Sequence, residues 1–188
     1  MVRWEPGGQG RLAQAAMELY GERGFDQTTV AEIAERAGLT ERTFFRHFSD
    51  KREVLFFGAQ ALQDLLVNTV VDAPASAAPI DAVTLALEAA GNLFNERRAF
   101  SVQRQHIIDG SAELQERELI KLSSLAAALA SALRRRGVAE STAGLTGEVA
   151  IAIFKISFER WVSSAEPRDL TQLMRYSLEQ LRVVTATQ

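Results

Sequence analysis

Apolar residues recur at intervals of three and four along most of the chain, a spacing typical of α-helices that bury one face. The sequence shows no strand-like alternation, no hairpin dipeptide and no repeat of fixed period. The pattern therefore predicts an all-α protein. The expected helices cover Arg11 to Arg23, Thr29 to Ala37, Glu41 to Phe48, Lys51 to Val71, Ile80 to Asn95, Arg97 to Asp109, Glu113 to Arg136, Thr142 to Ser164 and Asp169 to Thr185.

The second and third of these helices are short and joined by one tight turn. Thr29 and Glu32 have the spacing of a capping box, in which each side chain bonds the backbone N–H of the other residue. Gly38 supplies the left-handed conformation that ends a helix, and Thr40 can cap the next one. The spacing predicts a helix-turn-helix whose second helix has a polar, partly basic outer face and is too short to be stable alone.

The chain divides by composition into three parts. Residues 1–9 have turn chemistry and read as a flexible arm, which either enters a minor groove or is a loose terminus. Residues 10–56 form a three-helix helix-turn-helix head. Residues 57–188 form a larger helical domain, which the long helix over 51–71 joins to the head as a lever. Two prolines mark a linker within 73–79.

The last two predicted helices suggest self-association. The helix over 169–185 carries one continuous apolar stripe, and the helix over 142–164 is apolar on more than one face. A helix with two apolar faces needs two partners. The second partner is either another element of the same monomer or a second copy of the chain, which would form a four-helix interface across a twofold axis.

Composition excludes several kinds of site. The chain has 188 residues with 47% hydrophobic content, as expected for a globular protein. It has no cysteine, and His47 and His106 are far apart, so we expect no disulfide, metal site, cofactor or redox sensor. We find no nucleophile motif or phosphate-binding loop, which disfavours an enzyme. With no leader and no span of roughly 20 apolar residues, we expect a cytoplasmic, nucleoid-associated protein without a membrane partner.

The distribution of charge matters more than its total. The formal net charge is −3, which by itself disfavours binding to nucleic acid. Between residues 36 and 52, however, five Lys or Arg face two Asp or Glu, which gives this segment a charge of +3. The local basic character indicates that the head could bind DNA, and a dimer would double it.

The head resembles the TetR family of bacterial transcriptional regulators. The resemblance runs through AAMELYGERGF, TTVAEIAERAGL and TERTFFRHFSDKREVLF, over about residues 10–57. It implies a homodimeric, all-helical protein with a DNA-binding head, and a C-terminal domain that holds a ligand cavity and a dimer interface built from the last two helices. By position, the resemblance implies these DNA-contacting residues: Thr29, Thr40, Glu41, Arg42, Thr43, Phe45, Arg46, His47 and Lys51.

Within that set, the resemblance implies two kinds of contact. The implied phosphate contacts are Thr29, Thr43, His47 and Lys51, whereas the implied base contacts are Glu41, Arg42 and Arg46. The alternative is an ordinary solvated helix face. Phe45 departs from the family pattern, because many members have a tyrosine there whose hydroxyl meets a phosphate; it is expected to pack or to contact a sugar.

The C-terminal domain carries a weaker resemblance. Its run AELQERELIKLSSLAAALASALRRRGV is similar to a branch that binds acyl-CoA-like molecules. An apolar cavity with polar anchors would draw on the following residues: Phe94, Phe100, Gln103, Arg104, His106, Ile107, Phe154, Phe158 and Trp161. The alternative is that most of them form the core.

These observations lead to one functional hypothesis and two rivals. We expect a ligand-responsive regulator, usually a repressor, that binds a palindromic double-stranded DNA operator as a homodimer and is released by a small hydrophobic or acyl-like effector. The first rival is a DNA-binding regulator or architectural protein that responds to no small molecule. The second rival, an enzyme, is disfavoured for lack of a catalytic motif.

Overall fold

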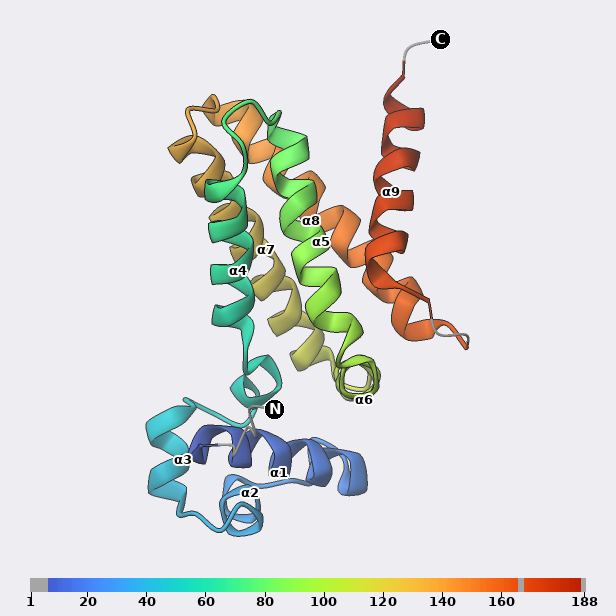
Figure 1. Ribbon diagram of the computed structural model, residues 1–188. Coiled ribbons are helices and arrows are strands. Elements are labelled where there is room, and N and C mark those ends of the chain that lie inside the picture. Colours follow the sequence, from blue (N-terminus) through green and yellow to red (C-terminus); the bar gives the residue numbers. More distant parts are fainter. Residues whose placement is uncertain (1–6, 166–167, 187–188) are drawn as a thin grey trace. The chain divides into compact units, whose positions relative to one another are not determined.

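The computed structural model describes residues 7–165 and 168–186, and within them all regular secondary structure is helical (Figure 1). The prediction of an all-α fold is confirmed. The helices, with η1 a 3₁₀-helix, are α1 (Gly8–Arg23), α2 (Val30–Arg36), α3 (Glu41–His47), η1 (Glu53–Phe56), α4 (Ala59–Asp72), α5 (Pro79–Asn95), α6 (Arg98–Asp109), α7 (Ala112–Arg135), α8 (Glu140–Ser163) and α9 (Leu170–Thr185).

Two expectations about local structure need correction. Most of the predicted arm lies outside the described residues, but its last two residues, Gly8 and Gln9, belong to α1. The continuous helix expected over 51–71 is wrong, because η1 ends at Phe56 and α4 begins at Ala59. Gly58 between them has φ 94°, a left-handed conformation that interrupts an α-helix.

One segment of the described chain, residues 53–72, is long and apolar enough by composition to cross a membrane, with a mean hydropathy of 1.5. The break at Gly58 leaves α4 with 14 residues, or about 21 Å of helix, against the roughly 30 Å of a bilayer core. Because α4 also packs along α5, we interpret α4 as part of the helical bundle of unit 2.

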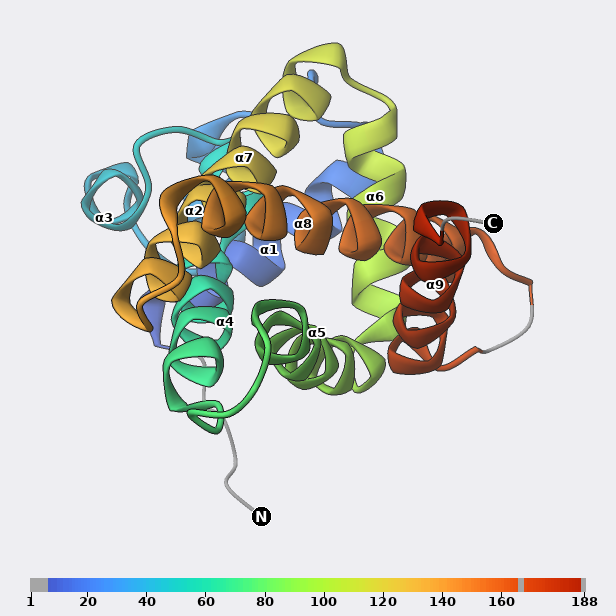
Figure 2. The same ribbon diagram turned by 90° about the horizontal axis from the view of Figure 1, so that it is seen from above.

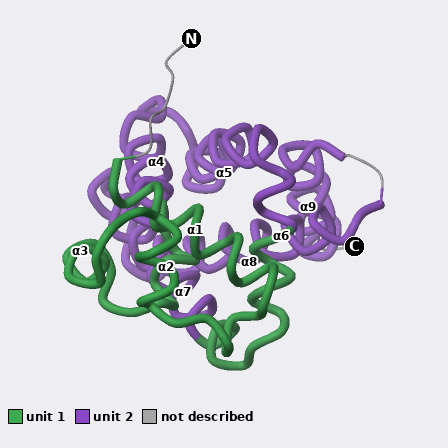
Figure 3. The backbone as a smooth tube through the Cα atoms, turned by 90° about the horizontal axis from the view of Figure 1, so that it is seen from below, with its two compact units in different colours: residues 1–58, 103–116 green, residues 59–102, 117–188 purple. Residues whose placement is uncertain are grey.

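The chain forms two compact units, which Figure 3 shows in different colours. Unit 1 contains residues 1–58 together with 103–116, and unit 2 contains residues 59–102 and 117–188. From the sequence we expected residues 57–188 to form one domain. In the structure, the second half of α6 and the first turn of α7 group with the head instead.

The core of unit 1 forms where the apolar stripes of its short helices meet. Leu12, Ile33 and Phe44, from α1, α2 and α3, are fully buried. The hydroxyl of Tyr20 donates to the backbone carbonyl of Lys51 at 2.6 Å, and burial raises the pKa of this phenol above its ordinary value. This hydrogen bond anchors the segment that follows α3 to α1.

In unit 2, α5 lies between α4 and α9, and α8 packs against both α5 and α9 (Figures 1 and 2). Two glycines permit close helix crossings. A Cβ atom added at Gly147 of α8 would lie 2.5 Å from the carbonyl oxygen of Ala126 in α7. One added at Gly91 of α5 would lie 2.5 Å from the hydroxyl of Thr171 in α9. At Gly147 the backbones of α7 and α8 therefore approach one another more closely than a Cβ atom would allow, whereas at Gly91 side chains of α9 occupy the space of the missing Cβ.

Candidate nucleic-acid interface

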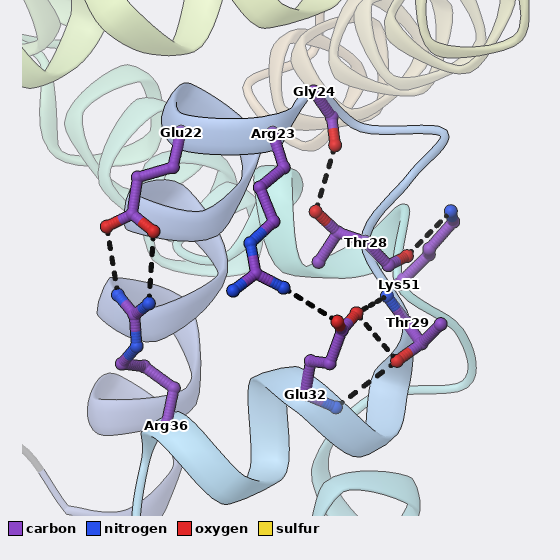
Figure 4. Close-up of polar contacts among 8 residues, drawn as sticks. All are labelled: Glu22, Arg23, Gly24, Thr28, Thr29, Glu32, Arg36 and Lys51. Carbon is purple, nitrogen blue, oxygen red and sulfur yellow. Dashed lines mark hydrogen bonds and ion pairs between the residues drawn. The ribbon is translucent and has the colours of Figure 1, made fainter.

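The N-terminus of α2 is closed by the predicted capping box (Figure 4). The backbone N–H and the hydroxyl of Thr29 both donate to Glu32 Oε2 at 2.9 Å, and the N–H of Glu32 donates to Thr29 Oγ1 at 3.3 Å. The bond from the Thr29 backbone lowers the pKa of the Glu32 carboxyl, and Arg23 on α1 also pairs with it at 2.8 Å. The first turn of α2 is thus fixed both locally and against α1.

The turn between α2 and α3 has the geometry that the glycine predicted. Gly38 has φ 66°, its N–H donates to the carbonyl of Glu35 at 2.9 Å, and the N–H of Leu39 donates to the carbonyl of Ala34 at 2.8 Å. Thr40 then caps α3, since its Oγ1 accepts from the N–H of Thr43 at 3.2 Å. Both ends of the turn are therefore set by hydrogen bonds, which fixes the orientation of α3 relative to α2.

Helix α3 has one buried face and one exposed face. Phe44 is fully buried, and Phe48, one residue beyond the helix, is also buried. The exposed face contains Glu41, Arg42, Phe45 and Arg46, whereas Thr43 and His47 are partly buried at its margin. The hydroxyls of Thr40 and Thr43 lie 3.1 Å apart. This exposed face of α3, which we call the ridge, therefore presents polar side chains and one aromatic ring to a partner.

Two cations of the basic segment are neutralised within unit 1. Arg36 forms a bidentate pair with Glu22 of α1, with both N–O distances at 3.0 Å (Figure 4). Arg52 pairs with Asp50 at 2.7 Å and with Glu113 of α7 at 2.5 Å. The Arg52 hydrogen bond holds the pKa of the Asp50 carboxyl below its usual range.

The charge of +3 counted for this segment therefore overstates its free positive charge. Arg42 and Arg46 form no hydrogen bond or ion pair with any residue that the structure describes, and both are exposed. They lie on the same face of α3, one turn apart. The cationic character of the ridge thus comes mainly from these two guanidinium groups.

Lys51 has a different environment from the one expected of a phosphate contact. Its Nζ donates to the carbonyl oxygens of Phe25 at 2.9 Å, Thr28 at 3.0 Å and Asp26 at 3.4 Å. It also lies 4.4 Å from the centroid of the Phe25 ring. The three donors of the ammonium group are engaged by the turn that joins α1 to α2. Lys51 therefore holds this turn in place, and a phosphate would have to displace one of these bonds.

Four of the proposed ligand residues lie together in unit 2. Phe94, Phe154, Phe158 and Trp161 form a chain of aromatic contacts with ring centroids 5.4 to 5.6 Å apart. Trp161 is fully buried, and its indole N–H donates to the carbonyl of Arg168 at 2.8 Å. The structure therefore brings these aromatic candidates together, in an arrangement that also serves as core.

The remaining ligand candidates lie apart from this cluster. Phe100 is 45% exposed on the part of α6 that belongs to unit 2, and the other candidates on α6 belong to unit 1. There, Gln103 Nε2 donates to the carbonyl of Met17 at 3.1 Å, and Arg104 Nε donates to the carbonyl of Leu55 at 2.7 Å. These two side chains attach α6 to the head and are not available as simple anchors for a ligand.

The other two proposed ligand-binding residues of α6 are Ile107 and His106. Ile107 is buried and His106 is exposed. The attachment of α6 to the head was not predicted, because nothing in the sequence distinguishes a side chain that bonds a distant backbone carbonyl from one that faces solvent or a cavity.

Two regions of the chain match known protein families. Residues 12–56 match the family described as bacterial regulatory proteins, tetR family, and residues 77–186 match the MftR C-terminal domain. The regulator TcmR of Streptomyces glaucescens is 35% identical over 79 residues, 42% of this chain and 35% of TcmR. The activator FasR of Mycolicibacterium smegmatis is 37% identical over 62 residues, 33% of this chain and 28% of FasR. The matched segments span about a third of these relatives.

Solved structures share the fold over nearly the whole chain. FadR of Thermus thermophilus, a TetR-family repressor in complex with lauroyl-CoA, has a TM-score of 0.61 at 23% identity and 96% coverage of both chains. FadR of Bacillus subtilis, in complex with stearoyl-CoA, has a TM-score of 0.63 at 18% identity, covering 95% of this chain and 98% of that one. The first family match covers the head, and the second covers more than half of the whole chain. The chain therefore belongs to the TetR family of bacterial transcriptional regulators.

Proposed function

We propose that this regulator is a ligand-responsive repressor, which binds a palindromic operator as a homodimer and leaves it when a small apolar, acyl-like effector binds. The observation that carries the proposal is the exposed face of α3, where Arg42 and Arg46 lack partners in the described chain while the opposite face is buried. Family membership makes it a transcriptional regulator and not an enzyme. An operator as partner implies a location at the nucleoid in the cytoplasm.

In this proposal, α3 occupies the major groove. Arg42 and Arg46 are the residues with free donors for guanine edges or phosphates, and Glu41 can accept from a cytosine amino group. Thr29, Thr40, Thr43 and His47 surround the ridge and would contact the sugar-phosphate backbone. Two copies of α3, one from each subunit, would then read half-sites in successive major grooves.

The proposed dimer forms through α8 and α9. Ile156 and Leu145 of α8 and Tyr176, Val183 and Val184 of α9 are large apolar side chains that remain exposed in one subunit. Covering them with the same helices of a second copy would remove this apolar surface from water.

A charge introduced into this surface tests the dimer. Ile156→Glu should shift the protein toward monomer in analytical ultracentrifugation. Leu119→Glu is the matched control, because Leu119 on α7 is equally apolar and similarly exposed, at 56% against 47% for Ile156. If both substitutions, or neither, altered the association constant, α8 would not form the interface.

The proposed effector site is in unit 2, beside the aromatic cluster. The clustered rings offer the apolar surface that an acyl chain needs, and two structures with the same fold were solved with lauroyl-CoA and stearoyl-CoA. The signal would pass along α6 and α7, which continue from unit 2 into unit 1. Gln103 and Arg104 would transmit it to the head through their bonds to the Met17 and Leu55 carbonyls.

A regulator without a small-molecule response remains the second candidate, and two observations favour it. Trp161 is fully buried within the aromatic cluster, and the expected polar anchors Gln103 and Arg104 are already bonded to backbone carbonyls. In that case the rings of unit 2 would simply be its core, and DNA affinity would not depend on any effector.

Titration of the protein–operator complex with an acyl-CoA separates these candidates. The operator is first located by footprinting the DNA around the gene of this protein. Lauroyl-CoA should then weaken operator binding at least tenfold, equivalent to about 1.4 kcal/mol, while coenzyme A alone should not. Unchanged affinity over a panel of acyl-CoA chain lengths and free fatty acids would favour the regulator without an effector.

A further inference from the structure

Phe45 lies on the exposed face of α3. It is 55% exposed, whereas its neighbour Phe44 is fully buried in the core of unit 1. The two rings make an edge-to-face contact, with centroids 5.4 Å apart and an interplanar angle of 81°. Phe45 is therefore not a core residue, and its contact with a buried neighbour limits where the ring can lie.

The groups around Phe45 are polar. Arg42 precedes it by three residues and is its neighbour on the helix surface, and Arg46 lies one turn from Arg42, so all three side chains belong to the exposed part of α3. The guanidinium groups can donate hydrogen bonds, but the phenyl ring neither donates nor accepts them. If α3 lies in a major groove with Arg42 and Arg46 on polar groups of the DNA, the ring beside Arg42 needs an apolar neighbour.

Only one base edge in the major groove provides such a neighbour. Guanine, cytosine and adenine present hydrogen-bond donors and acceptors there, whereas thymine also presents its C5-methyl group. An apolar ring placed against this methyl removes both from water, and placed against any other base edge it leaves polar atoms unpaired. A ring against deoxyribose would also be buried, but that contact would be the same for every sequence.

We propose that Phe45 determines sequence specificity by packing against the C5-methyl group of one thymine in each operator half-site. The inference rests on the proposed function, because it requires α3 to lie in the major groove. It adds the identity of one base and the chemical group through which that base is recognised.

Deoxyuridine provides the test, because it differs from thymidine only in lacking this methyl group. Each thymine of the footprinted operator is replaced in turn, symmetrically in both half-sites, and the dissociation constant is measured by fluorescence anisotropy. One position should weaken wild-type binding about fourfold per half-site, or about fifteenfold for the pair, as expected for the burial of one methyl. The other positions should have little effect.

Substitution of the ring supplies the second half of the test. Phe45→Ala should bind the thymine and deoxyuridine operators equally, and Phe45→Leu should keep part of the discrimination. Phe57→Ala, which removes another partly exposed ring from unit 1, should discriminate as the wild type does. Because Phe45 is exposed, the melting temperature of each Phe45 variant should match the wild type and confirm folding.

Two results would overturn the inference while leaving the proposed function intact. The first is an operator at which no deoxyuridine position weakens wild-type binding more than it weakens binding of Phe45→Ala. The second is an operator whose half-sites contain no thymine. Failure to bind any DNA from the locus would instead contradict the proposed function, and the inference with it.

Discussion

Different kinds of interaction stabilise the inside of each of the two units of this protein. In unit 1, short helices are fixed by directional bonds: a capping box at Thr29, a left-handed glycine at position 38, and the ammonium group of Lys51 on three carbonyls. In unit 2, longer helices pack through small residues and rings, as at Gly147 and Trp161. The difference indicates that the stability of the head depends on the geometry of its hydrogen bonds, whereas the stability of the bundle depends on how well its side chains fill the space between the helices.

The largest expected effect is the loss of packing in unit 2. Trp161→Ala removes a fully buried indole and should lower the free energy of unfolding by about 3–5 kcal/mol, as measured by urea denaturation. A loss below about 1 kcal/mol would mean that the aromatic cluster is not a tightly packed core. Trp161→Phe, which retains a ring, should be less damaging.

The next effect concerns the crossing of α7 and α8. Gly147→Ala places a Cβ atom 2.5 Å from a backbone oxygen and should destabilise the protein by about 1–3 kcal/mol. Gly144→Ala is the matched control on the same helix, because nothing lies within 4 Å of its added Cβ. The control should stabilise the helix by up to about 1 kcal/mol. Equal effects of the two substitutions would contradict close packing at Gly147.

In the head, Lys51→Met tests the hydrogen bonds by which the Lys51 ammonium group holds the turn between α1 and α2. Loss of the bonds to the Phe25 and Thr28 carbonyls should lower stability by about 1.5 kcal/mol and weaken operator binding by the same factor at every salt concentration. Arg46→Ala should instead reduce the slope of log K against log salt by about 2 per dimer. A similar reduction in slope for Lys51→Met would identify Lys51 as a phosphate contact after all.

The smallest effect concerns the capping box. Thr29→Ala should destabilise the head by about 1 kcal/mol, whereas Thr29→Ser should retain the cap. Because the folded pKa of Glu32 is lowered, the stabilisation is complete above its unfolded pKa of about 4.3 and is lost as pH falls through the folded value. The wild type should therefore lose more stability than Glu32→Gln, which has no carboxyl to titrate, as the pH is lowered from about 5 through the folded pKa of Glu32, as measured by thermal denaturation.

Local signals in the sequence were sufficient to predict most of the fold. Apolar spacing located the helices, and the residues Thr29, Gly38 and Thr40 predicted the turn that orients α3, because capping depends only on nearby residues. The break at Gly58 was not predicted, since a glycine within an apolar run can also lie inside a helix.

The site was less predictable, because its charges are cancelled by residues that are distant in the chain. Arg36 pairs with Glu22 and Arg52 with Glu113, contacts that arise only when the helices pack. Lys51 donates to backbone carbonyls, which every residue has, so no side-chain pattern in the sequence indicates these hydrogen bonds. The DNA contacts proposed for residues of the head are therefore predictions, as is the identity of the effector.

We propose above that two copies of α3 bind duplex DNA through the face that carries Arg42 and Arg46. Hydroxyl-radical footprinting of the wild-type protein on the DNA around its gene tests it most directly. We expect two symmetric protected half-sites whose centres are about 10 base pairs, or a multiple of this distance, apart, with protection lost in the Arg42→Ala, Arg46→Ala double variant. Absence of protection at low salt, or equal protection by the double variant, would contradict it.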